Sequence, residues 1–488
     1  MNEFDYLAEA QDKMNAEKYI DVILLCDKAL NINENLSDAY SFRANAKLEL
    51  GEYNNALDDF NELIKRYPNE AEHYYDRCFV YYQMDRFEDA IIDINKAIEL
   101  EPKTALYQYE KGRLEYELKR YNEAIADLTN AIALEPFEES YMYRGYCYQH
   151  LEKYDLALAD YNSASEIEPE SCTPYFQKGI VYRILDSIQE SEKNYKKAIE
   201  LNPKHDIALR ELGFIRIQLG KKDALTYLNK AIKANPSAEN YMFRVNARTN
   251  ILKREKCIKN FSIGKFTKYD TADYVIFNEK QAKYDIKDLN KALSLSPDDK
   301  LGLRLRAMAY NYLKQYDKAL TDYEYLIELD PNNQTHYLAY AKIKNTMGKY
   351  QDVIDSCNTF IRLNENKIDT DVFLLRGEAE YKLKQYEKVI DDTTVVISFD
   401  DSFGGYYYRG LAHYKLGHFR QAISDICKAI EIKSDVLETY DDKLPKLLSF
   451  AVGVNKGAGV NKKDKTKPQK SKTERPIGLA QLKKERNI

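Results

Sequence analysis

Hydrophobic and polar residues follow one another along most of the chain with the period of an amphipathic helix. Residues 107–136 show this clearly, because two apolar-periodic runs of about a dozen residues flank a polar break at Lys119 and Arg120. Pro136 ends the second run, as proline does beyond a helix end. The stretch therefore predicts two antiparallel helices. Since two helices this short cannot bury their apolar faces alone, they need neighbours of the same kind.

The same pattern returns about every 34 residues along the chain. The units end at regularly spaced prolines: Pro68, Pro102, Pro136, Pro169, Pro203, Pro236, Pro297 and Pro331. A period of this length, with two helices in each unit, predicts a solenoid in which each repeat packs only against its neighbours. Aligning the chain with itself gives twelve units, of which the first, near residues 3–34, is irregular. Irregularity is expected there because the outer face of a terminal repeat meets water.

Two positions of the unit are filled mostly by small residues, as expected where two helices approach closely. The eighth position, on the first helix, holds Ala10, Ala44, Cys78, Gly112, Gly145, Gly179, Gly213, Val245, Ala307, Ala341, Gly377 and Gly410. The twentieth position, on the second helix, holds Ala56, Ala90, Ala124, Ala157, Ser191, Ala224, Ala319 and Ala422. Both rows agree with the period of the prolines.

At these residues the chain resembles the tetratricopeptide repeat (TPR) family, and the resemblance covers roughly residues 3–434. It implies an all-α fold, a right-handed TPR superhelical solenoid of about twelve helix-turn-helix repeats. It also implies a non-catalytic scaffold or adaptor that binds a peptide, a helix or a partner domain in its concave groove. A regulatory subunit of an enzyme differs from this only in the identity of the partner.

The resemblance implies that positions 5, 9, 12 and 13 of each first helix line the groove. The candidate groove residues are Tyr75, Phe79, Tyr82, Tyr109, Arg113, Tyr116, Met142, Tyr146, Phe176, Ile180, Arg183, Arg210 and Phe214. Aromatic groups with interspersed arginines are typical of protein-binding surfaces. Alternatively, these side chains pack against the next repeat or against one another. Similar proteins that hold the acidic C-terminus of heat-shock chaperones need lysine at position 5 and asparagine at position 9, and Ser41 before Asn45 does not meet this pattern.

A second pattern links the two helices of a repeat. In eight repeats a base at position 7 occurs together with an aspartate at position 23, and we expect the two to pair because they lie level on facing helices. The predicted pairs are Arg43–Asp59, Arg77–Asp93, Lys111–Asp127, Arg144–Asp160, Arg244–Asp288, Arg306–Asp322, Arg376–Asp392 and Arg409–Asp425. Lys178, opposite Asn194, is the exception. Bases that are paired in this way make a poor surface for nucleic acid.

The repeats predict five segments. Residues 3–252 form a first array, with repeats 1–7 and the first helix of repeat 8, and residues 253–280 form an insert within repeat 8. Residues 281–434 form a second array, followed by a capping segment at 435–452 and a disordered basic tail at 453–488. The middle of the insert is aromatic and β-branched, which favours an irregular loop or a short hairpin. It is either a tolerated loop at the edge of the solenoid, or a contact element or joint.

Charge divides the chain unevenly. The tail carries a net +8, which leaves −14 on the rest of the chain, since the whole carries −6. The simplest alternative is that the tail stays solvated and has no function, and two further hypotheses give it one. The tail docks on an acidic solenoid and competes with the partner, or it makes the protein a nucleic-acid- or ribosome-associated factor.

Candidate chemistry is sparse. The sequence holds no motif for a nucleophile with its base, for a metal-binding loop or for a phosphate-binding loop, so we expect no enzyme and no cofactor. Seven scattered cysteines without metal-ligand spacing predict reduced thiols that serve as small apolar residues. No apolar run is long enough to span a membrane, and the acidic N-terminus does not resemble an export signal. A cytoplasmic location is expected.

Overall fold

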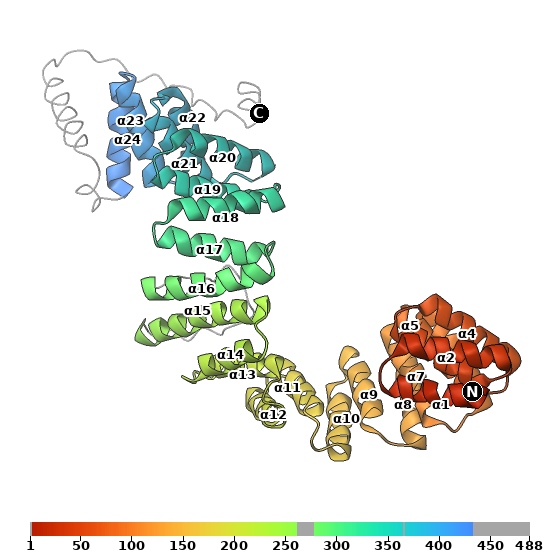
Figure 1. Ribbon diagram of the computed structural model, residues 1–488. Coiled ribbons are helices and arrows are strands. Elements are labelled where there is room, and N and C mark those ends of the chain that lie inside the picture. Colours follow the sequence, from red (N-terminus) through yellow and green to blue (C-terminus); the bar gives the residue numbers. More distant parts are fainter. Residues whose placement is uncertain (1, 261–277, 365–366, 433–488) are drawn as a thin grey trace, which may run out of the picture. The chain divides into compact units, whose positions relative to one another are not determined.

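The computed structural model describes residues 2–260, 278–364 and 367–432, without the side chains of 253–260 (Figure 1). These residues form helices joined by short turns, and no strand occurs among them. The chain divides into two compact units, Met1–Pro236 and Ser237–Ile488. The predicted capping segment 435–452, the basic tail 453–488 and the aromatic middle of the insert lie outside the described residues.

The first unit contains seven helical hairpins, which correspond to repeats 1–7. Its helices are α1 (Glu3–Asn15), α2 (Tyr19–Ile32), α3 (Ser37–Glu49), α4 (Tyr53–Arg66), α5 (Ala71–Gln83), α6 (Phe87–Leu100), α7 (Ala105–Glu117), α8 (Tyr121–Leu134), α9 (Glu138–His150), α10 (Tyr154–Ile167), α11 (Thr173–Ile184), α12 (Ile188–Leu201), α13 (Asp206–Gln218) and α14 (Ala224–Ala234). Odd-numbered helices are the first helices of their repeats, and each packs against the even-numbered helix that follows it.

The second unit continues the same scheme through repeats 8–12. Its helices are α15 (Ala238–Asn260), α16 (Glu279–Leu295), α17 (Lys300–Tyr312), α18 (Tyr316–Leu329), α19 (Gln334–Thr346), α20 (Tyr350–Leu363), α21 (Thr370–Lys382), α22 (Tyr386–Phe399), α23 (Phe403–Lys415) and α24 (Phe419–Ile432). The predicted all-α solenoid of helical hairpins is thus confirmed for the described residues, and its helices are consistent with the predicted number of about twelve repeats.

The hairpins turn at one residue with a left-handed backbone. This position, the fifteenth of the unit, has a positive φ in Gly51, Gly220, Gly348 and Gly417, and also in residues with side chains such as Lys119, at 61°. The next residue completes the turn, because its N–H donates a hydrogen bond to a carbonyl oxygen in the last turn of the first helix. Arg120 N, for example, donates to Glu115 O at 2.8 Å. Apart from α15, each first helix is therefore closed by a Schellman-like cap before the second begins.

The small residues at positions 8 and 20 lie where the two helices of a hairpin touch. Gly145 is an example, since a Cβ built on it would lie only 2.5 Å from Cε1 of Tyr161 on the facing helix. Ala157, at position 20 of the same repeat, is fully buried. Small residues at these positions belong to hydrophobic core clusters, each of which joins two neighbouring hairpins, as the period of the small residues predicts.

The first helix of repeat 8 is longer than the repeat pattern predicts. The sequence ends it near Leu252, whereas α15 continues to Asn260, and α16 begins at Glu279. The extra residues, KREKCIKN, include neither proline nor glycine, so nothing in them ends a helix. The boundary between the two compact units lies at the end of repeat 7 rather than at the insert, because the first unit ends at Pro236 and the second begins at Ser237.

Candidate binding surface

All eight predicted pairs between positions 7 and 23 form in the structure. In seven of them the arginine Nε and Nη2 donate to the two carboxylate oxygens of the aspartate at 2.6–3.0 Å. In the eighth, Lys111 Nζ lies 3.2 Å from Oδ1 of Asp127. The eight pairs are named the ladder below. They join the two helices of each hairpin at one level, and the prediction is confirmed.

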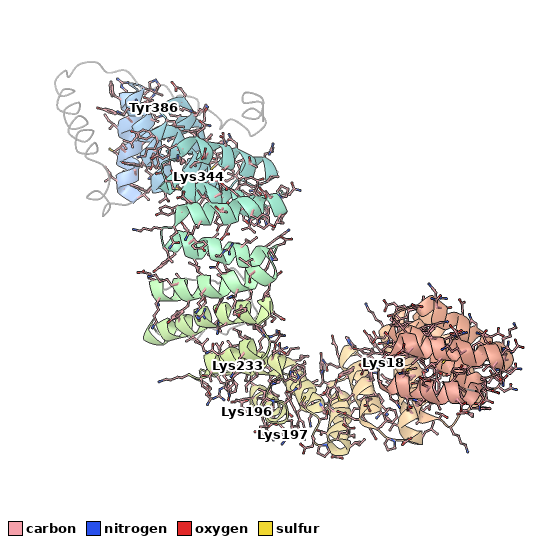
Figure 2. All side chains as sticks on the ribbon, in the orientation of Figure 1. Lys18, Lys196, Lys197, Lys233, Lys344 and Tyr386 are labelled. Carbon is pink, nitrogen blue, oxygen red and sulfur yellow. The ribbon has the colours of Figure 1, made fainter. Side chains whose placement is uncertain are left out.

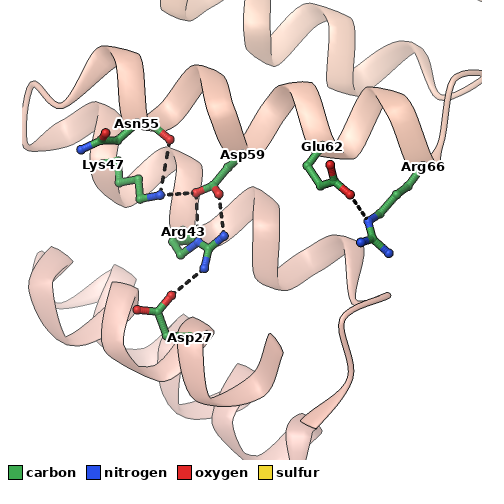
Figure 3. Close-up of polar contacts among 7 residues, drawn as sticks. All are labelled: Asp27, Arg43, Lys47, Asn55, Asp59, Glu62 and Arg66. Carbon is green, nitrogen blue, oxygen red and sulfur yellow. Dashed lines mark hydrogen bonds and ion pairs between the residues drawn. The ribbon is translucent and has the colours of Figure 1, made fainter. Parts of the chain in front are cut away.

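The third nitrogen of six of these arginines reaches back to the preceding repeat. Arg43 Nη1 donates to Oδ1 of Asp27 on α2 at 2.6 Å, while its other nitrogens hold Asp59 on α4 (Figure 3). The equivalent partners of the other five are Arg77–Asn61, Arg144–Thr129, Arg306–Asn290, Arg376–Asn358 and Arg409–Thr394. Each of these arginines therefore fastens three helices, and the ladder connects repeats as well as helices.

Two of the repeats without a complete pair, repeats 6 and 10, keep the contact to the preceding repeat. Lys178, which faces no aspartate, donates to Oδ1 of Asn162 at 3.0 Å. Burial lowers the pKa of Lys178, since it has exchanged water for neutral oxygen acceptors. In repeat 10 the hydroxyl of Tyr340 donates to Oε1 of Glu324 at 3.1 Å. Position 7 is thus always used for structure in these repeats, whichever residue occupies it.

The ladder leaves its bases unsuited to bind phosphate. Its aspartates are at most 8% exposed. Burial by itself would lower the pKa of Arg376, but the hydrogen bonds that it donates to Asp392 raise it, so the guanidinium stays charged and bound. Some lysines outside the ladder also pair locally, as Lys344 does with Asp352 at 3.0 Å and Lys196 with Glu192 at 2.7 Å. Figure 2 labels both lysines on the ribbon. No stripe of free bases of the kind that nucleic acid needs arises from these groups.

A second set of contacts joins successive first helices in unit 1. The rings of Tyr75 on α5 and Tyr107 on α7 lie 5.4 Å apart, and those of Tyr109 on α7 and Tyr143 on α9 lie 5.8 Å apart. We call the side of α5, α7, α9, α11 and α13 that carries these side chains the first-helix face. It holds the predicted groove residues.

Between α5 and α7 the face combines an aromatic ring with an ion pair. The guanidinium of Arg113 lies over the ring of Tyr82, 4.0 Å from its centroid, and its Nη2 is 2.6 Å from Oε2 of Glu110. Phe79 on the same face of α5 is 37% exposed, more than any other predicted groove residue described here. This part of the face is accessible and already stabilises a cation against a ring.

Between α7 and α9 the aromatic side chains form a connected cluster. Tyr116 contacts Tyr143 at 5.5 Å and Tyr146 at 6.2 Å between ring centroids, and its hydroxyl lies 3.2 Å from Nε2 of His150. Burial raises the pKa of Tyr116 to about 12, with Tyr121 and nearby acids adding to the effect. The cluster is half-buried. The alternative that these tyrosines pack against one another is therefore what the structure shows for their rings, although each side chain stays partly exposed.

The α11–α13 part of the face has a different character. Phe176 packs on His205 at 4.6 Å and on Tyr195 at 5.9 Å, and Ile180 joins the same cluster. Arg183 Nε lies 3.4 Å from Oε2 of Glu211. Phe214 is half-buried. The side chains here are occupied mainly with their own repeat and the next one.

Two of the predicted groove residues do not offer a surface. Met142 is 4% exposed and packs in the core of repeat 5, and Arg210 is 8% exposed. The interpretation that they contact a partner directly is corrected accordingly. Both residues occupy position 5, and the sequence period could not show their burial because Tyr75 and Tyr109 at the same position remain half-exposed.

The structure adds residues of the face that the sequence analysis did not single out. Asp76 on α5, Glu110 on α7 and Tyr143 on α9 occupy position 6 of their repeats, next to the ladder base. They were missed because the position changes from carboxylate to ring and so shows no periodic signal. The spacing of Asp76 and Phe79, three residues apart on one helix, was the available clue.

The described residues contain no group of three or more His, Cys, Asp or Glu placed to hold a metal ion. Four of the six described cysteines are buried, and burial raises the pKa of the Cys26 thiol to about 12. A thiol with so high a pKa is a poor nucleophile. None of the described helices is both long enough and apolar enough to cross a membrane.

Stacked helical hairpins with small residues at the closest approach and a side-chain face on the first helices define a helical repeat protein. Models described as tetratricopeptide repeat match residues 43–105, 80–137 and 109–171, and a second such model matches 173–205, 305–333 and 404–436. The chain is a tetratricopeptide repeat protein.

Individual relatives are distant. The chain is 22% identical over 363 residues to the TPR repeat-containing protein MJ1428 of Methanocaldococcus jannaschii, which covers 60% of this chain and 64% of that protein. It is 23% identical over 311 residues to the DnaJ protein P58IPK homolog A of Oryza sativa subsp. japonica, covering 60% and 55%. The chain thus spans less than two thirds of these curated relatives. Among solved structures, YrrB, titled a TPR protein with an unusual peptide-binding site, covers 39% of this chain and 97% of its own at 22% identity and a TM-score of 0.33.

Proposed function

We propose that this chain is a non-catalytic scaffold that binds a segment of another protein on the first-helix face of unit 1. TPR proteins generally mediate protein–protein interactions, and the family membership supports this class of work. The observation that carries the proposal is the face itself, where Phe79 is exposed and half-buried tyrosines from three successive first helices adjoin one another. Aromatic side chains at such a density supply much of the binding energy of protein interfaces.

The proposal is tested with two matched variants of repeat 3. Phe79→Glu places a charge on the first-helix face, and Ile92→Glu does the same on α6, where Ile92 is 67% exposed. Proteins captured from the native cell by the tagged chain are identified by mass spectrometry, and helix content and thermal unfolding are compared beforehand. We expect Phe79→Glu to lose partners that Ile92→Glu retains. Equal capture by all three chains, or equal loss with both variants, contradicts the proposal.

A further inference from the structure

The carboxylate of Asp76 stands out on the first-helix face because it has no counter-charge. Within the described residues it makes neither a hydrogen bond nor an ion pair, although it is only partly exposed. Glu110 occupies the same position one repeat later and is bound by Arg113 at 2.6 Å. The comparison shows what the site at Asp76 lacks, a cation at the same level of the face.

The surroundings of Asp76 raise the cost of leaving it unpaired. Burial raises its pKa to about 7, and Glu72 on the same helix adds to the rise. The charge of Asp76 contributes in turn to the raised pKa of Tyr75 on α5 and of Tyr107 on α7. A partly dehydrated carboxylate gains free energy when a cation binds beside it.

The bases of these first helices cannot supply that cation. Three of them, Arg77, Lys111 and Arg144, are bound to aspartates of the ladder. Arg113 is bound to Glu110 and stacked on a ring. The lysine and arginines of α5, α7 and α9 are therefore all paired with carboxylates other than that of Asp76.

Acids predominate among the remaining charges near the tyrosines of the face. Glu139 acts on Tyr109, and Glu117 acts on both Tyr116 and Tyr143, in each case raising the tyrosine pKa in addition to burial. Tyrosine rings themselves attract cations through their faces, as the position of Arg113 over Tyr82 demonstrates in this same surface. Charge and ring chemistry thus favour the same kind of ligand.

We propose that the first-helix face of α5, α7 and α9 binds a partner segment that carries lysine or arginine, with one cation paired to Asp76 and lying against the neighbouring tyrosine rings. The inference rests on the proposed function and specifies its partner, a basic rather than an acidic peptide. Asp76 is the specificity-determining residue, because it is the unpaired acid of this surface that lies largely withdrawn from water, next to the tyrosine rings.

The test uses a short fluorescent peptide rich in lysine, and the same peptide with acetylated lysines or with glutamates in their place. Fluorescence anisotropy gives the affinity of each for the full chain. We expect the lysine peptide to bind best and acetylation to remove most of the binding. Equal binding of the acetylated peptide, or tighter binding of the glutamate peptide, overturns the inference.

Two variants locate the cation. Asp76→Asn is expected to weaken binding of the lysine peptide about 10-fold, as for loss of one charge-assisted contact of roughly 1.4 kcal/mol. Asp58→Asn, on α4, changes the net charge equally at an exposed position and is expected to leave the affinity unchanged. Equal weakening by both variants would mean that the peptide responds only to overall charge, and would overturn the inference.

A pH series separates Asp76 from structural effects. Because its pKa is raised to about 7, Asp76 gains a proton as the pH falls from 8 to 6, and the affinity for the lysine peptide should fall with it. The titratable groups coupled to Asp76 are Glu72 and Tyr75 on α5 and Tyr107 on α7, and Glu110 on α7 acts on Tyr75 in turn. The Asp76→Asn chain should lack this pH dependence, and a slope equal to that of the unaltered chain contradicts the assignment.

The outcomes also distinguish the two proposals. If Phe79→Glu loses its cellular partners while no lysine peptide binds the unaltered chain, the face binds proteins but not through a cation. If the lysine peptide binds and Asp76→Asn weakens it, whereas Phe79→Glu keeps all partners, the cation site exists apart from the proposed function.

Discussion

At the scale of single residues, the ladder makes burial the main determinant of what a substitution costs. Arg376 and Asp392 form its most buried arginine pair, with side chains 4% and 2% exposed, whereas the side chain of Arg409 opposite Asp425 is 20% exposed. Removing one partner of a buried pair leaves a charge that water cannot reach. The same ion pair should therefore contribute a different free energy of stabilisation in different repeats.

This argument predicts an order for two alanine variants. Asp392→Ala should lower the free energy of unfolding by ~3–5 kcal/mol, because Arg376 is left buried without the carboxylate that balances its charge. Asp425→Ala should cost less, on the order of 1–2 kcal/mol, because Arg409 can turn its guanidinium to water. Denaturant unfolding followed by circular dichroism measures both. Equal losses would show that burial of the arginine does not set the cost.

The sequence predicted the ladder but not the site proposed at Asp76, and the reason is physical. The ladder recurs at fixed positions, so comparing repeats within one chain reveals Arg144 with Asp160 as readily as homologues would. Asp76 occupies a position that elsewhere holds Glu110 or Tyr143, and its significance depends on the absence of a neighbour. Such an absence appears only when the surrounding helices are in place.

At the scale of helices, the glycines at position 8 differ in how tightly the partner helix presses on them. A Cβ on Gly145 would lie 2.5 Å from Cε1 of Tyr161, which is fully buried and cannot move aside freely. A Cβ on Gly377 would meet Asp392 and Thr393 no closer than 3.6 Å, an ordinary contact distance. Glycine at position 8 is thus required sterically in repeat 5, whereas in repeat 11 the structure has room for a Cβ at this position.

The two glycines therefore predict opposite effects of alanine. Gly145→Ala should destabilise its hairpin by ~1–3 kcal/mol through overpacking. Gly377→Ala should be neutral or stabilise by up to ~1 kcal/mol, because alanine is the better helix former. Hydrogen exchange in Gly145→Ala should rise in repeats 4–6 and hardly in repeats 10–12, since a solenoid couples mainly neighbours. Uniform loosening along the chain would contradict this expectation.

Helix ends were the least predictable elements. Repeat comparison placed the end of the first helix of repeat 8 near Leu252, because that is where the other first helices stop. The residues that follow favour helix as well, and no glycine or proline interrupts them before Gly264. A periodic alignment fixes where equivalent residues lie, but local propensity decides how far a helix continues past the last of them.

At the scale of the whole molecule, the chain is a series of nearest-neighbour units with an uneven charge. Each arginine of the ladder that reaches back to the preceding repeat extends the coupling by one hairpin, so stability is built repeat by repeat. The described array is acidic in sequence, and the basic segment 453–488, with its net +8, lies outside the described residues. Such a charge distribution favours contact between a basic segment and an acidic repeat surface, in the same chain or in a neighbouring one.

The last prediction concerns that segment. If residues 453–488 compete with a basic partner for the acidic solenoid, a chain ending at Val452 should bind the lysine peptide more tightly than the full chain does. The gain should shrink from low to physiological salt, because attraction between exposed charges is screened within about 10 Å. Anisotropy titrations of both chains at both salt concentrations measure it, and a variant with the lysines of 461–470 changed to glutamine controls for length. A docked basic segment of the same chain must reduce binding of the free lysine peptide. Equal affinities of the full and shortened chains at both salt concentrations would therefore contradict the competition.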